Sequence, residues 1–126
     1  MKILIAEDVK HTAEQYKIML EENNHQVTLA HTGTECIKKY QDKSKDKTQK
    51  PIFDVVVLDY RLPEKDGLQV AKEIFKINPA QRIIFASAYV KEALIDATKE
   101  LDTDVEILEK PFELEDFVKQ VETGSS

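Results

Sequence analysis

The chain has 126 residues, of which 41% are hydrophobic and 33% are charged, and its formal net charge is -6. This length and composition are typical of one globular domain whose core needs neither disulfides nor a structural metal. The negative charge argues against non-specific binding to nucleic acid or to an anionic membrane, so we expect neither as a partner. No apolar run reaches the roughly 18 residues of a membrane span, and the predicted first strand leaves no room for a signal peptide.

The first two repeating units each combine a strand with a helix. An apolar run at 3–6 predicts a strand, and Ala13, Tyr16 and Leu20 recur at helical spacing up to Asn24, which suits a left-handed helix end. Residues 25–30 then alternate between apolar and polar side chains, which favours a strand at the edge of a sheet. A second helix is predicted over 33–43, and for the charged stretch 43–50 a solvated loop or frayed helix end is favoured over a binding patch.

The single cysteine, Cys36, lies on one face of this second helix with Ile37 and Tyr40. It cannot form an internal disulfide, and a small core residue is the favoured interpretation over a reactive thiol. This cysteine usage predicts a cytoplasmic protein.

Three more units follow. The uninterrupted apolar runs 55–58 and 83–86 predict central strands that are buried on both faces, and the run 105–108 predicts a fifth strand. A third helix is expected to begin near Asp66 and to end before Asn78. The fourth and fifth helices are predicted from two apolar stripes: Ala93, Leu94, Ala97 and Leu101, then Leu114, Phe117, Val118 and Val121.

Five such units predict an α/β fold with a doubly wound, five-stranded parallel sheet. Right-handed crossovers give the strand order 2-1-3-4-5 most simply. In that order the first and third strands are neighbours, and the crevice between their carboxyl ends is where open α/β sheets bind ligands.

Four of the predicted strands lead into polar residues at this edge. Glu7 and Asp8 follow the first strand, Asp59 the third, Ser87 the fourth, and Lys110 comes shortly after the fifth. Each has an ordinary alternative: an acid can cap a helix or turn, a serine can bond its own backbone, and a lysine can be a surface charge. As a set they predict a single pocket.

The chemistry of this pocket points to phosphoryl transfer. Three carboxylates repel one another unless a cation lies among them, and an acidic pair facing a lone acid suits Mg²⁺ better than a Ca²⁺ cage. Asp59 is ionised at neutral pH and is our candidate nucleophile. Lys110 and the Ser87 hydroxyl would bind the remaining phosphoryl oxygens.

With these residues in register, the chain resembles the receiver domain of two-component response regulators over roughly residues 1–121. The matching motifs are Glu7-Asp8, Asp59, Leu62-Pro63, Asp66-Gly67, Ser87 and Lys110-Pro111-Phe112. The resemblance implies a flavodoxin-like (βα)5 domain over 1–122 with a short tail at 123–126. It also implies a cis bond between Lys110 and Pro111.

By the same resemblance, Asp59 accepts a phosphoryl group from a histidine kinase or a histidine phosphotransfer protein. Glu7, Asp8, Asp59 and the backbone carbonyl of Arg61 are the implied Mg²⁺ ligands, with Glu7 acting through water. Such a protein is not an enzyme for other substrates, because it catalyses only its own phosphorylation and dephosphorylation. Its downstream protein target is unknown, and with no output domain expected, a relay, a phosphate sink and an effector all stay open.

Two positions depart from the usual receiver pattern. Ile107 stands where most receivers carry a switching aromatic residue. The run from Phe85 to Tyr89 is similar to one found in a group of single-domain receivers that also lack that aromatic. The chain as a whole resembles a single-domain, chemotaxis-regulator-like receiver. We therefore take Ser87 and Tyr89 as candidate switch residues, with a half-exposed loop aromatic as the equal alternative for Tyr89.

Other functions fit less well. A flavin mononucleotide protein needs a hydroxyl- and glycine-rich phosphate loop where Glu7 and Asp8 stand. A haloacid-dehalogenase-type phosphatase needs a second acid where Arg61 stands, and a P-loop enzyme needs more than the three glycines present. The serious alternative is a receiver-like interaction module that is not phosphorylated, and its mark would be the loss of a pocket residue. None is lost.

Overall fold

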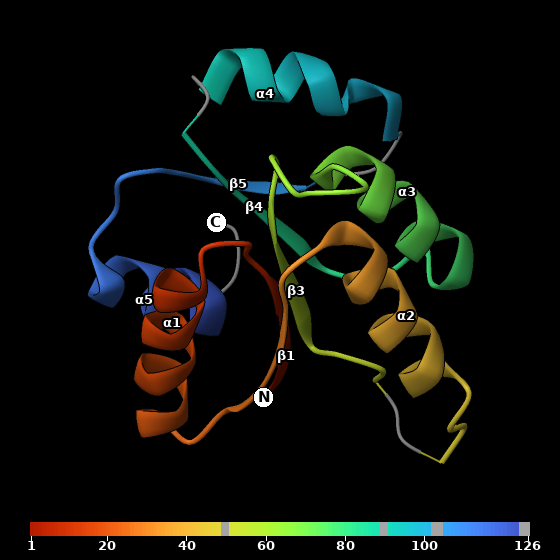
Figure 1. The fold of residues 1–126 in the computed structure, drawn as a ribbon, viewed down its shortest axis with the longest axis horizontal. Helices are drawn as coiled ribbons and strands as arrows, with labels where there is room; N and C mark the ends of the chain where they lie inside the picture. Colours follow the sequence, from red (N-terminus) through yellow and green to blue (C-terminus); the bar gives the residue numbers. More distant parts are fainter. Residues whose placement is uncertain (49–50, 89–90, 102–104, 124–126) are drawn as a thin grey trace.

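The computed structural model describes residues 1–48, 51–88, 91–101 and 105–123, and these residues form a five-stranded parallel sheet flanked by helices (Figure 1). The strand order is β2-β1-β3-β4-β5, which confirms the predicted fold class and strand order. The elements, in chain order, are β1 (Lys2–Ala6), α1 (Lys10–Glu22), β2 (Gln26–Ala30), α2 (Gly33–Ser44), β3 (Val55–Asp59), α3 (Gly67–Ile77), β4 (Ile83–Ser87), α4 (Lys91–Thr98), the 3-10 turn η1 (Lys99–Leu101), β5 (Glu106–Glu109) and α5 (Leu114–Thr123).

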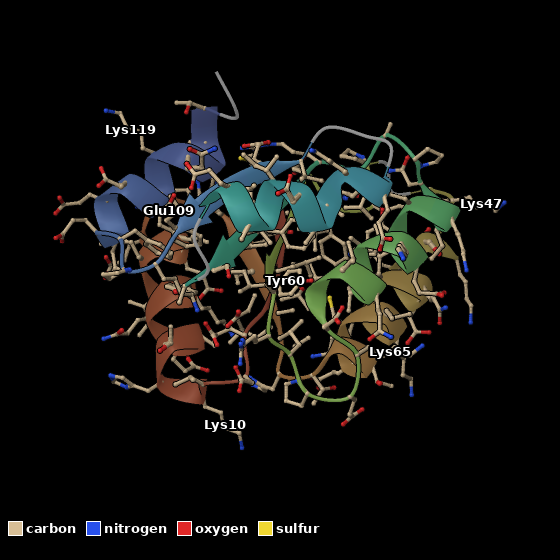
Figure 2. All side chains as sticks on the ribbon, turned by 90° about the horizontal axis from the view of Figure 1, so that it is seen from above. Lys10, Lys47, Tyr60, Lys65, Glu109 and Lys119 are labelled. Atoms are coloured by element: carbon tan, nitrogen blue, oxygen red, sulfur yellow. The ribbon has the colours of Figure 1, made fainter. Side chains whose placement is uncertain are left out.

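The sheet separates two layers of helices. Helices α1 and α5 cover one face, and α2, α3 and α4 cover the other (Figure 1). The side chains of β1 and β3 are almost fully buried because each of these strands contributes to both hydrophobic clusters. Strand β2 lies at the edge and is partly exposed, as its alternating pattern predicts. Figure 2 shows four labelled lysines, Lys10, Lys47, Lys65 and Lys119, around the rim of the molecule.

Local signals set the ends of several helices. Asn24 adopts a positive φ of 69° after α1, as its sequence context predicts. Asp66 begins α3 with a capping box, in which its carboxylate accepts the Gln69 N–H and the Gln69 side chain accepts the Asp66 N–H. Thr32 caps α2 by accepting the Glu35 N–H at 3.0 Å.

Three expectations need correction or extension. Ala93 is exposed although it belongs to the predicted stripe of α4, because that helix buries a narrow face centred on Leu94 and Thr98. The Thr98 hydroxyl donates to the Leu94 carbonyl at 3.0 Å, and the chain then tightens into η1. Strand β5 begins one residue later than predicted. Helix α5 extends to Thr123, the first residue of the expected tail. Residues 124–126 lie outside the described part, so the boundary between the domain and its tail stays a prediction.

Cys36 is fully buried in the cluster under α2, which confirms it as a core residue. Burial raises the pKa of its thiol to about 12. None of the helices in the described segments is long and apolar enough to cross a membrane.

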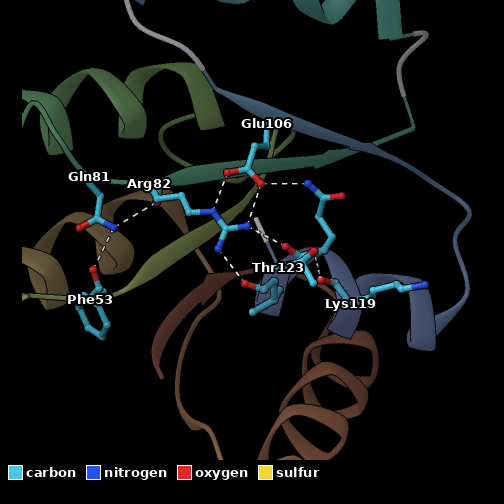
Figure 3. A network of polar contacts seen from close by, with 8 residues as sticks. Phe53, Gln81, Arg82, Glu106, Lys119 and Thr123 are labelled. Atoms are coloured by element: carbon cyan, nitrogen blue, oxygen red, sulfur yellow. Dashed lines mark hydrogen bonds and ion pairs between the residues drawn. The ribbon is translucent and has the colours of Figure 1, made fainter. Parts of the chain in front are cut away.

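A polar network joins β5 and α5 to the start of β4, at the end of the sheet opposite the candidate pocket (Figure 3). Arg82, just before β4, binds Glu106 of β5 through two nitrogens at 2.6 and 2.8 Å. The same guanidinium donates to the carbonyls of Gln120 and Val121 near the end of α5, both at 2.7 Å. Arginine thus satisfies helix-terminal carbonyls and joins α5 to two strands.

Replacing Arg82 with methionine keeps the apolar stem and removes every donor, leaving the Glu106 carboxylate, whose side chain is 10% exposed, without its cation. We expect the free energy of unfolding to fall by about 2–4 kcal/mol in urea denaturation. The exposed pair of Lys76 with Glu73 provides a control, and Lys76→Met should change stability by less than about 1 kcal/mol. Equal effects of the two substitutions would contradict a structural role for the network.

Candidate functional site

The carboxyl ends of β1 and β3 bring three acids together. Because these strands are hydrogen-bonded neighbours, Glu7 and Asp8 after β1 lie beside Asp59 at the end of β3. One carboxylate oxygen from each residue lies within 4.8 Å of the others. The side chains of Glu7 and Asp59 are only 3% and 15% exposed, so solvent screens their repulsion poorly.

Lys110, which follows β5, places its ammonium between two of these carboxylates. Its Nζ donates to Glu7 Oε1 at 2.7 Å and to Asp59 Oδ2 at 3.1 Å. Burial alone would lower the pKa of Lys110, but the hydrogen bond to Glu7 and the charges of Asp59 and Glu7 outweigh it and raise the pKa above its ordinary value. Lys110 is therefore a fixed positive charge at neutral pH.

Asp8 projects beside this ion pair. Its side chain does not cap α1, because Val9 is the capping residue and makes no side-chain bond, while the Val9 N–H donates to Glu7 Oε2 at 3.2 Å. Desolvation raises the pKa of Asp8 above its ordinary value, and a hydrogen bond with Glu7 and the Glu7 charge add to this effect. Asp8 is thus an exposed acid whose ionised form is disfavoured in the absence of metal.

Asp59 borders a cavity of about 370 Å³, and the other residues that line this cavity are Asp8, Arg61, Ser87, Ala88 and Lys110. Its Oδ1 accepts the Arg61 N–H at 3.2 Å, which places the peptide before Arg61 next to the acid. Two of the three clustered acids, Asp8 and Asp59, line this cavity, and Glu7 lies beside them. Hard carboxylate oxygens so close together fit Mg²⁺, which prefers oxygen ligands and leaves coordination positions for water or phosphate.

The fourth and fifth strands complete the wall. Ser87 ends β4 and is only 2% exposed, and its carbonyl accepts the Lys110 N–H at 2.7 Å. The bond between Lys110 and Pro111 is cis, as expected. The structure therefore brings together the five site residues predicted from the strand ends: Glu7, Asp8, Asp59, Ser87 and Lys110.

Of the other candidate switch residues, Ile107 lies within the described part of the chain and Tyr89 does not. Ile107 lies on β5 in register with Phe85 and is partly buried against the cluster under α4. Tyr89 lies outside the described residues, so its role as a switch stays a prediction. Tyr60, directly after Asp59, packs on Phe85 with ring centroids 6.3 Å apart, and Figure 2 shows it near the centre of the molecule.

Sequence reasoning did not single out the contact that holds the loop after Asp59. The Gly33 N–H donates to the Pro63 carbonyl at 3.1 Å, and a Cβ on Gly33 would overlap the carbonyl oxygen of Lys65. At the other end of the loop, a Cβ on Gly67 would lie 2.7 Å from the Asp59 carbonyl oxygen. Two glycines thus permit the close approach that sets the path of the chain through Arg61.

Comparison with known proteins gives one consistent result. Residues 3–122 match the family model of the response regulator receiver domain. The chain is 32% identical to the chemotaxis protein CheY of Thermotoga maritima over 114 residues, which cover 89% of this chain and 87% of that protein. It is 30% identical to CheY of Bacillus subtilis over 122 residues, covering 95% of this chain and 93% of the relative.

A solved structure supports the same likeness. The Francisella response regulator 1452 receiver domain superposes with a TM-score of 0.79 at 30% identity, covering 96% of this chain and 93% of that one.

The raised pKa of Asp8 makes a prediction about pH. A carboxylate whose pKa is higher in the folded than in the unfolded state destabilises the fold when ionised, and this penalty disappears as the pH falls through the raised pKa toward the ordinary value of 3.8. In metal-free buffer at pH 7, Asp8→Asn should therefore be more stable than wild type, by less than about 1 kcal/mol because the group is exposed.

Urea denaturation at pH 7 and near pH 4 measures the difference, which should shrink at the lower pH. Glu14→Gln, which removes an exposed acid of α1, is the control and should show no such trend. A marked loss of stability in Asp8→Asn at pH 7 would contradict the interpretation.

Proposed function

The chain belongs to the response regulator receiver domain family, and from this membership we propose that it accepts a phosphoryl group on Asp59 with the help of Mg²⁺. Receiver domains are phosphoacceptor signalling modules of two-component systems, and they bind Mg²⁺ at an acidic pocket. The observation that carries the proposal is the convergence of Glu7, Asp8 and Asp59 around the ammonium of Lys110.

Asp59 is the proposed nucleophile because it ends a buried central strand and faces the cavity. Its Oδ1 is held by the Arg61 N–H and its Oδ2 by Lys110, so the carboxylate has a fixed orientation before any donor arrives. Attack by a carboxylate oxygen on phosphorus would form an acyl phosphate, and the leaving group would depart on the opposite side. Positioning of this kind supplies much of the catalysis in phosphoryl transfer.

The residues proposed to hold Mg²⁺ are Glu7, Asp8, Asp59 and Arg61, the last through its backbone carbonyl. The ion, when bound, supplies positive charge that lets the anionic donor approach the carboxylates. Lys110 is the proposed partner of one phosphoryl oxygen, since its ammonium already lies 3.1 Å from Asp59 Oδ2. The Ser87 hydroxyl is the proposed partner of another, and a shift of Ser87 toward this oxygen is the proposed start of the output signal.

Receiver domains act between histidine kinases and downstream targets, and the proposed donor here is a histidine kinase or a histidine phosphotransfer protein. A change in partner binding on phosphorylation is the proposed output. A cytoplasmic location is also proposed, and the free, buried thiol of Cys36 is compatible with it.

Incubation with acetyl phosphate and Mg²⁺ tests the proposal directly. We expect intact mass to rise by one phosphoryl unit in wild type, to stay unchanged when Mg²⁺ is chelated, and to stay unchanged in Asp59→Asn. Asp54→Asn, which alters an acid just before the same strand, should label like wild type. An unlabelled wild type would instead favour the unphosphorylated interaction module.

Lys110→Ala separates phosphoryl binding from metal binding. Because the ammonium competes with a cation for Glu7 and Asp59, its removal should leave Mg²⁺ affinity equal to wild type or higher, while labelling by acetyl phosphate slows. Lys119→Ala removes the same charge from the exposed surface of α5 and should alter neither property. Mg²⁺ titration followed by amide chemical shifts gives the affinities, and a severe loss in Lys110→Ala would refute the assignment.

A further inference from the structure

His31 lies directly after β2 and contacts the acidic end of β1. The two strands pair up to Ala6 with Ala30, and the Glu7 N–H then donates to the Ala30 carbonyl at 3.0 Å. The Glu7 carbonyl is 3.0 Å from His31 Nδ1. A side chain thus extends the pairing of β1 with β2 past the end of the strands.

The partner fixes the chemistry of this contact. A carbonyl oxygen only accepts hydrogen bonds, so the proton of the ring must be on Nδ1. The main chain of His31 is held separately, because its N–H donates to Glu35 Oε1 at 2.6 Å. Glu35 lies in the first turn of α2, where its N–H donates to the hydroxyl of the capping Thr32, and the hydrogen bond from the His31 N–H lowers the pKa of the Glu35 carboxyl. The imidazole is therefore attached to a backbone that α2 immobilises.

The bonded carbonyl belongs to the peptide between Glu7 and Asp8, the two acids of the proposed metal site. Rotation of this peptide would turn both carboxylates, because they leave the chain from its two ends. A Val9 N–H bond holds the Glu7 carboxylate on one side, and Lys110 holds it on the other. The peptide itself is held by the ring of His31 through the Glu7 carbonyl. The Ala30 carbonyl holds the preceding peptide, whose N–H belongs to Glu7.

We propose that His31 is a positioning residue that fixes the peptide between Glu7 and Asp8 and thereby pre-orients the metal-binding carboxylates. The inference rests on the proposed Mg²⁺ site. The hydrogen bond of the His31 ring goes to the Glu7 carbonyl, so its proposed action on the carboxylates passes through the backbone. Outer partners of metal ligands commonly change affinity by 10- to 100-fold, and a bond to a ligand's backbone should contribute less.

Two substitutions of similar size separate the hydrogen bond from the shape of the side chain. The Asn side-chain nitrogen is attached to Cγ like Nδ1 of histidine, so His31→Asn retains a donor in the same place. His31→Leu fills similar space without a donor. Urea denaturation establishes that both variants are folded before their Mg²⁺ affinities are compared by amide chemical-shift titration.

We expect Mg²⁺ to bind His31→Leu about 3- to 10-fold more weakly than wild type, and His31→Asn within about 2-fold of wild type. In the metal-free proteins, the Asp8 amide nitrogen should shift in His31→Leu and return toward wild type in His31→Asn, because this nitrogen shares its peptide with the Glu7 carbonyl.

Equal affinity of wild type and His31→Leu, or equal weakening in both variants, would overturn the role of His31 and leave the metal site intact. Failure of wild type to bind Mg²⁺ would instead overturn the proposed function. An unchanged Asp8 shift in metal-free His31→Leu would overturn the inference by itself, whatever the metal affinities are.

Discussion

The ammonium of Lys110 is the constraint on which the carboxyl edge of the sheet depends. Glu7 and Asp59 are nearly buried, and two charges at such distances interact strongly where water is scarce. Without a cation the edge could persist only by protonating an acid or by separating the strands. Lys110 reaches both acids because its backbone N–H is fixed to the Ser87 carbonyl, which aligns the end of β5 with β4. The order of the strands therefore determines which charges meet in the candidate site.

Much of this edge was predictable because it depends on short-range patterns. Apolar runs and helical stripes gave the five units, chirality gave the strand order, and the polar residues after each strand marked the pocket. The contacts made by His31 and Gly33 were not predictable in this way. Each joins segments whose closeness follows only from the finished packing, and neither residue type signals a partner by its position. The predicted burial of Ala93 was wrong for a related reason. The width of the helix face that becomes buried depends on the elements packed against it, and these are known only from the finished fold.

The segment that leads into α2 contacts both the acidic pair after β1 and the loop after β3, which together carry the proposed metal site. The ring of His31 contacts the peptide between the acids. Two residues later, the Gly33 N–H donates to the Pro63 carbonyl, and the missing Cβ of Gly33 leaves room for the Lys65 carbonyl oxygen. Both contacts come from residues 31–33, which lead into α2, and α2 lies on the opposite face of the sheet from α1. A movement of α2 would therefore reach the acids and the Arg61 loop together, although α2 supplies no candidate ligand.

The two ends of the sheet also differ in how their charges are paired. At the far end, Arg82 binds the Glu106 carboxylate and two carbonyls of α5. The charges of Arg82 and Glu106 therefore neutralise each other there. At the carboxyl end, one ammonium serves two carboxylates, and a third acid has a raised pKa. An added phosphoryl group would compete with Glu7 for Lys110, because the ammonium can turn toward the stronger anion. The position of Lys110 directly after β5 would then couple the end of this strand to the proposed phosphorylation.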